Sequence, residues 1–310
     1  MRTRPITMPL VAIVAAQGLS ACGGGGSSGI AEIPAPPTPT PTPTTTPQTI
    51  LSAVTTSQQF TSRGATYAIS HGEANHGTAL PDPLLGDGDQ LKIRFDAASK
   101  TYEVQLPQAQ TWLPVALPAN TVVAGDGSYW ETADHTVTVS ASSGANAALV
   151  LWSGPSSFGV TAVANPTIAS EIPKSGSAQY LGGIAGYSSE KFPVFLSGRP
   201  FGQRVGSIGG TISLAFNFGS GTLGGSLSPS LMGSENSYAL PTLNFTDTIY
   251  AAGSTTFAGK LDTTVPGLNS FSGLFAGPAA GDIAGNFAFP YLSPVNGAPQ
   301  QAAGAFTAHQ

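Results

Sequence analysis

Apolar and polar residues alternate strictly over 91–95 and again over 102–106. Alternation with a period of two is typical of a β-strand that is buried on one face. The small and polar residues between them, 96–101, predict the loop of an antiparallel hairpin. The expected partners are Leu91 with Leu106, Ile93 with Val104, Phe95 with Tyr102, and Arg94 with Glu103. The first three pairs make an apolar face, and the charged pair lies on the solvent side.

The second half of the chain repeats this pattern between glycine-rich turns. Over 211–218 every second residue is apolar, and 219–221 supply a turn before the alternation resumes at 223–227. The strands expected here are 177–187, 211–218, 223–227, 243–250, 255–261, 270–275, 283–289 and 303–308. Eight strands just fill a small barrel, and closure removes exposed strand edges. The pattern therefore predicts an eight-stranded antiparallel up-and-down β-barrel.

A separate β-rich domain is expected before the barrel. Besides the hairpin, 136–140 and 147–152 have the composition of strands. Two prolines and few large apolar residues over 165–177 place the domain boundary near residue 173. The prediction is an all-β chain with a first domain at 51–172 and a barrel at 173–310.

Composition supports this fold class and excludes several others. Gly and Pro account for 39 and 26 of the 310 residues, and both destabilise helix interiors. A helical bundle, a coiled coil and a doubly wound α/β enzyme are therefore not expected. The net charge of −5 argues against a nucleic-acid partner, which requires a basic surface. The single cysteine excludes a disulfide framework and a cysteine-based zinc site.

The start of the chain has the features of a secretory signal. Two arginines precede an apolar run at 8–16, which is too short to cross a membrane. Small residues then precede Cys22, in a pattern that resembles the lipobox of bacterial lipoproteins. Residues 1–21 are thus expected to be a signal peptide, and Cys22 the acylated residue that anchors the protein in a membrane. Gly23, where Asp would favour the inner membrane, points to the outer membrane.

A tether is expected between the lipid and the first domain, over 22–50. It begins with the sequence GGGGSSG, which is typical of a flexible linker. A run of alternating Pro and Thr residues follows, which predicts an extended polyproline-II spacer.

His71 and His76 form the only histidine cluster in the sequence. Their spacing and the neighbouring glycines do not match the helical zinc motif. Two interpretations stay open, namely ligation of haem or a metal ion by a loop, and a solvated loop without a ligand. Neither a metal nor a cofactor is predicted.

Two further motifs each allow a functional and a structural interpretation. Tyr129 and Trp130 follow a turn, and an exposed pair there would suit the anchor of a protein interface. The alternative is that Trp130 begins a strand and is buried. Residues 219–224 match G-x-G-x-x-G, but 225–229 cannot form the helix that a dinucleotide site needs. No group of residues supports catalysis, and the protein is not expected to be an enzyme.

Three segments of the second half carry a resemblance to a known family. Residues 177–187, 210–214 and 271–287 resemble strands of the transferrin-binding protein B type of barrel. The last segment keeps the family's Gly-Pro pair, at Gly277 and Pro278, and its phenylalanines, at Phe275 and Phe287. It departs from the family pattern at two places, where Asp282 replaces Glu and Ala284-Gly285 replaces Gly-Gly.

The resemblance implies a location and a mode of action. Members of this family are surface lipoproteins that bind host transferrin, factor H or haemoglobin. In the family each lobe pairs an eight-stranded barrel with a β-rich "handle". The expected function is capture of an extracellular protein or solute at the bacterial outer membrane, in the service of iron acquisition. His71, His76, Tyr129 and Trp130 are the candidate ligand contacts. The alternatives are a haem-type small-ligand carrier and a structural envelope lipoprotein.

Overall fold

The computed structural model describes residues 50–51, 54–68, 83, 85, 90–116, 128–142, 144–196, 199–233 and 236–310. Cys22, most of the tether, His71 and His76 lie outside the described residues. The described part of the chain consists of β-strands and turns with two short 3-10 turns, which confirms the all-β class. It contains no helix that is long and apolar enough to cross a membrane.

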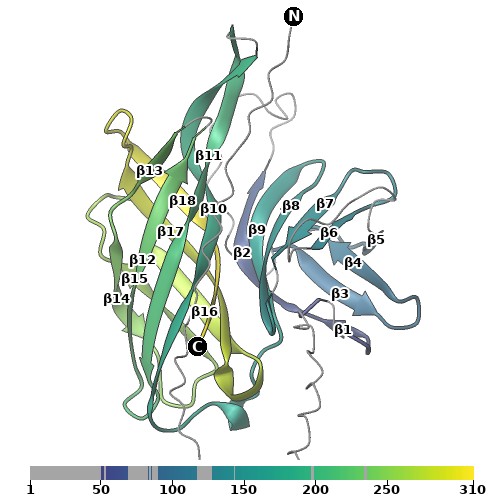
Figure 1. Ribbon diagram of the computed structural model, residues 1–310, viewed down its shortest axis with the longest axis vertical. Helices are drawn as coiled ribbons and strands as arrows, with labels where there is room; N and C mark the ends of the chain where they lie inside the picture. Colours follow the sequence, from purple (N-terminus) through teal and green to yellow (C-terminus); the bar gives the residue numbers. More distant parts are fainter. Residues whose placement is uncertain are drawn as a thin grey trace, which may run out of the picture. The chain divides into compact units, whose positions relative to one another are not determined.

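The second half forms a closed barrel (Figure 1). Its strands are β10 (Ser177–Leu196), β11 (Arg199–Asn217), β12 (Thr222–Met232), β14 (Leu243–Ile249), β15 (Thr256–Leu261), β16 (Ser270–Ala276), β17 (Asp282–Leu292) and β18 (Pro299–His309), with a short β13 (Ser237–Ala239) beside β12. All pairings are antiparallel, and β10 pairs with both β11 and β18 while β12 pairs with both β11 and β14. This confirms the predicted up-and-down barrel.

The β10–β11 hairpin is longer than the pattern predicts. The pairing of β10 with β18 ends at Ser188, and a register shift follows between Ser188 and Lys191. From Lys191 opposite Val205 to Leu196 opposite Arg199, β10 and β11 continue as a two-stranded ribbon. The register shift breaks the alternation of apolar and polar residues, which is why the sequence pattern stops at 187.

Aromatic side chains fill the barrel interior. The ring centroid of Phe216 lies 4.8 Å from that of Phe275 and 5.1 Å from that of Phe257. Gly285 leaves room for the Phe306 ring, because a Cβ at this position would lie 2.2 Å from it. The interior is therefore a packed core, as the alternation over 211–218 predicts.

The described residues of the first half form two sheets, which together we call the handle. One contains β1 (Gln58–Gln59), β3 (Lys92–Asp96), β4 (Thr101–Gln105) and β5 (Leu113–Val115) in that order. The other has the order β2 (Thr61–Ala68), β9 (Ser157–Ala164), β8 (Ala147–Ser153), β7 (Thr138–Ala141) and β6 (Ser128–Glu131). Apolar residues of both sheets share one core, including Ile93, Val104, Val139 and Trp152.

The predicted hairpin register is confirmed in β3 and β4. Ile93 lies opposite Val104, Phe95 opposite Tyr102 and Arg94 opposite Glu103. Ile93 and Val104 are buried in the handle core. The strands themselves pair from Lys92 with Gln105 onwards, so the expected Leu91–Leu106 pair falls just beyond the hydrogen-bonded part of the hairpin.

The five-stranded sheet of the handle packs against the outer wall of the barrel. Small side chains meet there, including Ala162 and Ala164 of β9, and Ala284 and Ala305 of the barrel. The Tyr67 hydroxyl of β2 donates to the backbone oxygen of Ala303 at 2.8 Å. The handle and barrel thus share a buried interface in which most residues are alanines.

The Gly-Pro motif lies at this interface. Gly277 has φ 74° and precedes the 3-10 turn η3 (Pro278–Ala280). A Cβ on Gly277 would lie 2.4 Å from the side chain of Asn146, so glycine is needed for both conformation and space. Asp282, which replaces the family's Glu, accepts hydrogen bonds from the Asn146 backbone N–H at 3.1 Å and from Asn146 Nδ2 at 2.7 Å. The motif is therefore a docking point for the handle.

The link between the handle and the barrel runs through Pro166 and Thr167. Pro166 forms an isolated bridge with Ala276, and the Thr167 backbone N–H donates to Phe275 O at 2.9 Å. The 3-10 turn η2 (Ala169–Glu171) then leads to β10. The boundary near residue 173 stays a prediction.

Candidate functional site

The side chains of Tyr129 and Trp130 point to opposite faces of one sheet. Both lie on β6, where adjacent side chains point to opposite faces of the sheet. Trp130 is 8% exposed and packs on Tyr102 with ring centroids 5.3 Å apart. This is the buried alternative for Trp130. Tyr129 is half-buried, and its hydroxyl donates to Glu131 Oε2 at 3.5 Å.

Metal ligands do not gather in the described part of the chain. No three His, Cys, Asp or Glu side chains lie close enough together there to hold a metal ion. The loop that carries His71 and His76 lies outside the described residues, so its candidate haem or metal site stays a prediction.

A cluster of charged and aromatic side chains lies on the four-stranded sheet. Because Ile93, Val104 and Val115 point into the handle core, their strand neighbours point outward. One row of partners crosses all four strands, with Gln59 opposite Arg94, Arg94 opposite Glu103, and Glu103 opposite Pro114. We call this row, with Trp112 beside it, the outer handle face.

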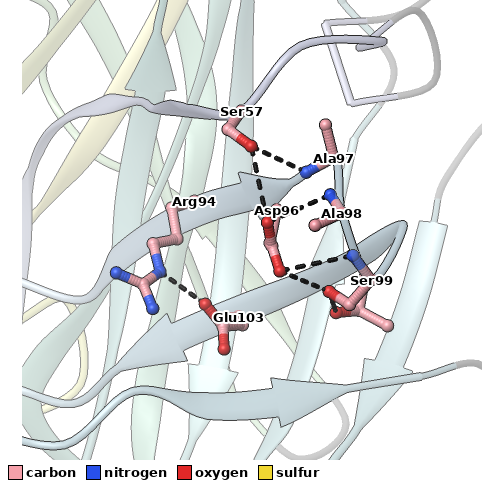
Figure 2. Close-up of polar contacts among 8 residues, drawn as sticks. Ser57, Arg94, Asp96, Ala97, Ala98, Ser99 and Glu103 are labelled. Carbon is pink, nitrogen blue, oxygen red and sulfur yellow. Dashed lines mark hydrogen bonds and ion pairs between the residues drawn. The ribbon is translucent and has the colours of Figure 1, made fainter.

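Arg94 is the centre of the outer handle face. Its Nε forms an ion pair with Glu103 Oε2, as Figure 2 shows. Its Cζ lies 4.3 Å from the centroid of the Trp112 ring, a cation–π contact. The Arg94 side chain is 40% exposed and that of Glu103 is 19% exposed. The carboxylate and the indole thus hold a partly exposed guanidinium in one orientation.

The hairpin loop next to this face is held by Asp96. Its carboxylate accepts hydrogen bonds from the Ser99 hydroxyl at 2.7 Å, from the Ala98 backbone N–H at 3.2 Å and from the Ser57 hydroxyl at 3.4 Å (Figure 2). The hydrogen bond from Ser99, followed by that from Ala98, lowers the pKa of the Asp96 carboxyl. These hydrogen bonds support the loop at neutral pH, when Asp96 is ionised.

This arrangement can make a protein contact. Arg and Trp are enriched among the residues that dominate binding energy at protein interfaces, since both offer large surfaces with a polar group. The hairpin pattern placed Arg94 and Glu103 correctly on the solvent side. It did not identify Trp112, because β5 is only three residues long and contains Pro114, which hides its alternation.

The fold and this surface define a class of protein. It has a packed eight-stranded barrel, a two-sheet handle docked on the barrel wall, and a polar and aromatic face on the outer sheet. Residues 172–310 match the family model of the C-lobe and N-lobe beta barrels of Tf-binding protein B. The barrel part of the chain, residues 172–310, is therefore similar to the barrels of transferrin-binding protein B, as the resemblance predicted.

Solved structures give further matches. A point mutant of transferrin binding protein B from Haemophilus parasuis Hp5, described as a vaccine antigen, is 15% identical with a TM-score of 0.36; the match covers 74% of this chain and 53% of that one. Isotype 1 transferrin binding protein B from serogroup B Neisseria meningitidis is 15% identical with a TM-score of 0.40, over 80% of this chain and 43% of that one. This chain thus spans about half the length of these proteins. No curated protein matches the sequence.

Proposed function

We propose that the protein is a non-enzymatic lipoprotein of the bacterial outer surface that captures an extracellular protein, and that it serves iron acquisition. The match of residues 172–310 to the barrels of Tf-binding protein B carries this proposal. In the proposed arrangement Cys22 bears the lipid, and the tether holds the handle and barrel away from the membrane.

Recognition is proposed to occur on the outside of the molecule. The aromatic core of the barrel, with Phe216, Phe257 and Phe275 in mutual contact, occupies the space that a carrier would use for a small ligand. The outer handle face offers an Arg–Trp pair held in place by Glu103. We propose that Arg94 and Trp112 contact the captured protein. Tyr129, Trp130, His71 and His76 stay predictions as ligand contacts.

A capture experiment tests the proposed contact. The mature chain, purified in detergent, is immobilised and exposed first to iron-loaded transferrin and then to culture and host fluids, and bound proteins are identified by mass spectrometry. Arg94→Ala and Trp112→Ala should each weaken capture by about tenfold or more, as expected for interface hot spots. Lys260→Ala is the matched control, because Lys260 also forms an exposed ion pair, with Asp247 Oδ2 at 3.2 Å.

Other results would redirect the proposal. Equal capture by all three variants would exclude the outer handle face. A shifted Soret band on addition of haem, lost in a His71→Ala/His76→Ala double variant, would favour the small-ligand carrier.

For the anchor, Cys22→Ala should release the protein from the membrane fraction. Normal processing and membrane partitioning of Cys22→Ala would contradict the lipoprotein assignment.

A further inference from the structure

The barrel wall has its shortest strand pairing between β12 and β14. Two residue pairs connect these strands, and they join Ser226–Leu227 of β12 to Leu243–Asn244 of β14. Within the described residues, no strand pairing joins the start of β12, 222–225, to the rest of β14, 245–249. In contrast, β17 and β18 pair along their full lengths. The facing edges of β12 and β14 therefore form a seam in the barrel wall.

Core residues beside the seam are less completely covered than the aromatic residues of β16, β17 and β18. Leu223 of β12 is 7% exposed, and Tyr250, which directly follows β14, is 9% exposed. Phe275, Phe287 and Phe306 are fully buried. The seam thus coincides with a thinner cover over the barrel core.

The segment Thr246–Ile249, which we call the strap, is weakly held on its other edge as well. A register shift interrupts its pairing with β15 between Thr246 and Ile249. Asp247 has φ 45°, in the left-handed region that is uncommon for residues other than glycine. Its carboxylate forms an ion pair with Lys260 Nζ at 3.2 Å, in which both side chains are more than half exposed. Exposed ion pairs of this kind contribute little to stability.

Aromatic side chains anchor the strap at both ends. Phe245 stacks on Phe271 of β16, with ring centroids 4.2 Å apart, and Tyr250 lies edge-on to Phe216 at 5.1 Å. The residues of the strap itself do not belong to the barrel core. The strap can therefore move while both anchors stay in place, because its movement breaks few buried contacts.

The Tyr250 hydroxyl at one end of the strap is buried, and it has no hydrogen-bond partner among the described residues. Tyr180, in the same core, differs because its hydroxyl donates to Ala280 O at 2.6 Å. A buried hydroxyl without a partner destabilises the closed state, since it has given up its hydrogen bonds to water. Contact with water would remove this penalty.

We propose that the strap opens locally, away from β12, and that this opening admits water to the Tyr250 hydroxyl while the other barrel strands stay paired. Two effects oppose each other. The ion pair between Asp247 and Lys260 favours the closed strap, and the unpartnered hydroxyl favours the open one. Because salt screens exposed ion pairs, the opening should also respond to ionic strength.

Amide hydrogen exchange of the full chain in detergent tests the opening. Mass spectrometry follows two peptides, one that covers 245–250 and one that covers 270–276 in β16. Exchange in 245–250 should be slower than in an unfolded peptide and should not respond to urea up to about 1 M, because a local opening exposes little surface. Exchange in 270–276 should become faster with urea, because it requires a large opening of the barrel.

Variants of the two opposing groups test the cause. Tyr250→Phe should slow exchange in 245–250 by about fivefold or more, because it removes the hydroxyl that favours the open strap. Tyr180→Phe is the matched control and should not slow it, since that hydroxyl has a partner. Lys260→Ala should speed up exchange by about twofold, and about 1 M salt should act on the original chain in the same way. Lys174→Ala, at an exposed lysine before β10, should have no effect.

Three results would overturn the proposal. Exchange in 245–250 at the rate of an unfolded peptide would show that the strap is not closed. A urea dependence equal to that of 270–276 would show that it opens only with the whole barrel. Unchanged or faster exchange in Tyr250→Phe would show that the hydroxyl does not favour opening. Urea midpoints verify that each variant folds, and Tyr250→Phe should unfold at the same or a higher urea concentration than the original chain.

Discussion

β17 and β14 belong to the same barrel, but their outer faces have different environments. All but the terminal residues of β17 are buried, because its inner face packs in the barrel core and its outer face lies under the handle. β14 is buried only at its first residue, and Ile249 at its other end is exposed. The outer residues of β17 include Ala284 and Ala288, whereas those of β14 include Asn244 and Thr246.

The difference shows how the chain marks the wall that receives the handle. A strand of an antiparallel barrel normally alternates apolar and polar residues, because one face meets water. Where alanine replaces the polar residue, the outer face can be buried without a large side chain to hold the sheets apart. Ala284 and Ala288 of β17, with Ala303 and Ala305 of β18, are thus part of the interface and do not belong to the barrel core.

Removing the handle from the barrel should have the largest effect on stability. A fragment that starts near residue 172 should form a β-rich, protease-resistant barrel, since its strands pair with their neighbours along the chain. It should unfold at lower denaturant concentration than the whole chain, because its alanine wall loses the handle. Circular dichroism and urea titration measure both properties. A disordered fragment would show that the barrel needs the handle to fold.

A charge on the covered wall is the next largest change. Ala305→Arg should lower the free energy of unfolding by about 3 kcal/mol or more, because it places a cation in a buried apolar interface. Ala305 is fully buried between β18 and the handle. Ala215→Arg, on the exposed face of β11, should change this free energy by less than about 0.5 kcal/mol. Equal losses would mean that the wall is not covered in solution.

Buried and exposed positions can also be compared within one strand of the handle, β3. Ile93→Ser should cost about 3 kcal/mol, because Ile93 is 1% exposed in the handle core. Arg94→Ser should cost less than about 1 kcal/mol, because its ion pair with Glu103 is partly exposed to water. Urea midpoints of the two variants decide the order, and a reversed order would indicate a hairpin register shifted by one residue.

Removal of a single hydroxyl group tests one contact of the handle–barrel interface. Tyr67→Phe should lower the free energy of unfolding by about 1–2 kcal/mol, since it removes the hydrogen bond that the hydroxyl shares between Ala303 O at 2.8 Å and Tyr187 O at 3.1 Å. Tyr238→Phe, a half-buried residue beside the barrel core, is the control and should be close to neutral. If Tyr67→Phe were equally neutral, the hydroxyl would not hold the handle in place.

Alkaline pH tests a second buried tyrosine, Tyr180, in the barrel core. Burial raises the pKa of Tyr180 from its ordinary value of 10.0 to about 12. The folded state therefore favours the neutral phenol. This contribution to stability is complete below pH 10 and is lost as the pH rises to about 12. The midpoint temperature of thermal unfolding is measured between pH 9 and 12, the range given by these pKa values. It should decline less steeply with pH for Tyr180→Phe than for the original chain. An identical slope would contradict this role of Tyr180.

The sequence pattern determined the barrel and the hairpin because both depend on local alternation. Ile93 and Arg94 occupy the faces expected from their neighbours alone. The docking of the handle was not predicted, because Ala305 and Ala162 are far apart in the chain and alanine is compatible with either face of a strand. The burial of Trp130 depends on Tyr102 of the other sheet, and the Arg94–Trp112 contact depends on a third strand. Such contacts between elements leave no periodic signal.

The ribbon formed by 191–196 and 199–205 has a consequence for local stability. Its two strands hydrogen-bond to each other beyond the point where β18 ends its pairing with β10. A two-stranded ribbon is only marginally stable by itself. Its amides can therefore exchange with solvent through openings that leave the barrel closed. Native-state hydrogen exchange should show a gradient along β10, fast in the ribbon and slow from Leu181 to Ser188, where β10 has strand partners on both edges.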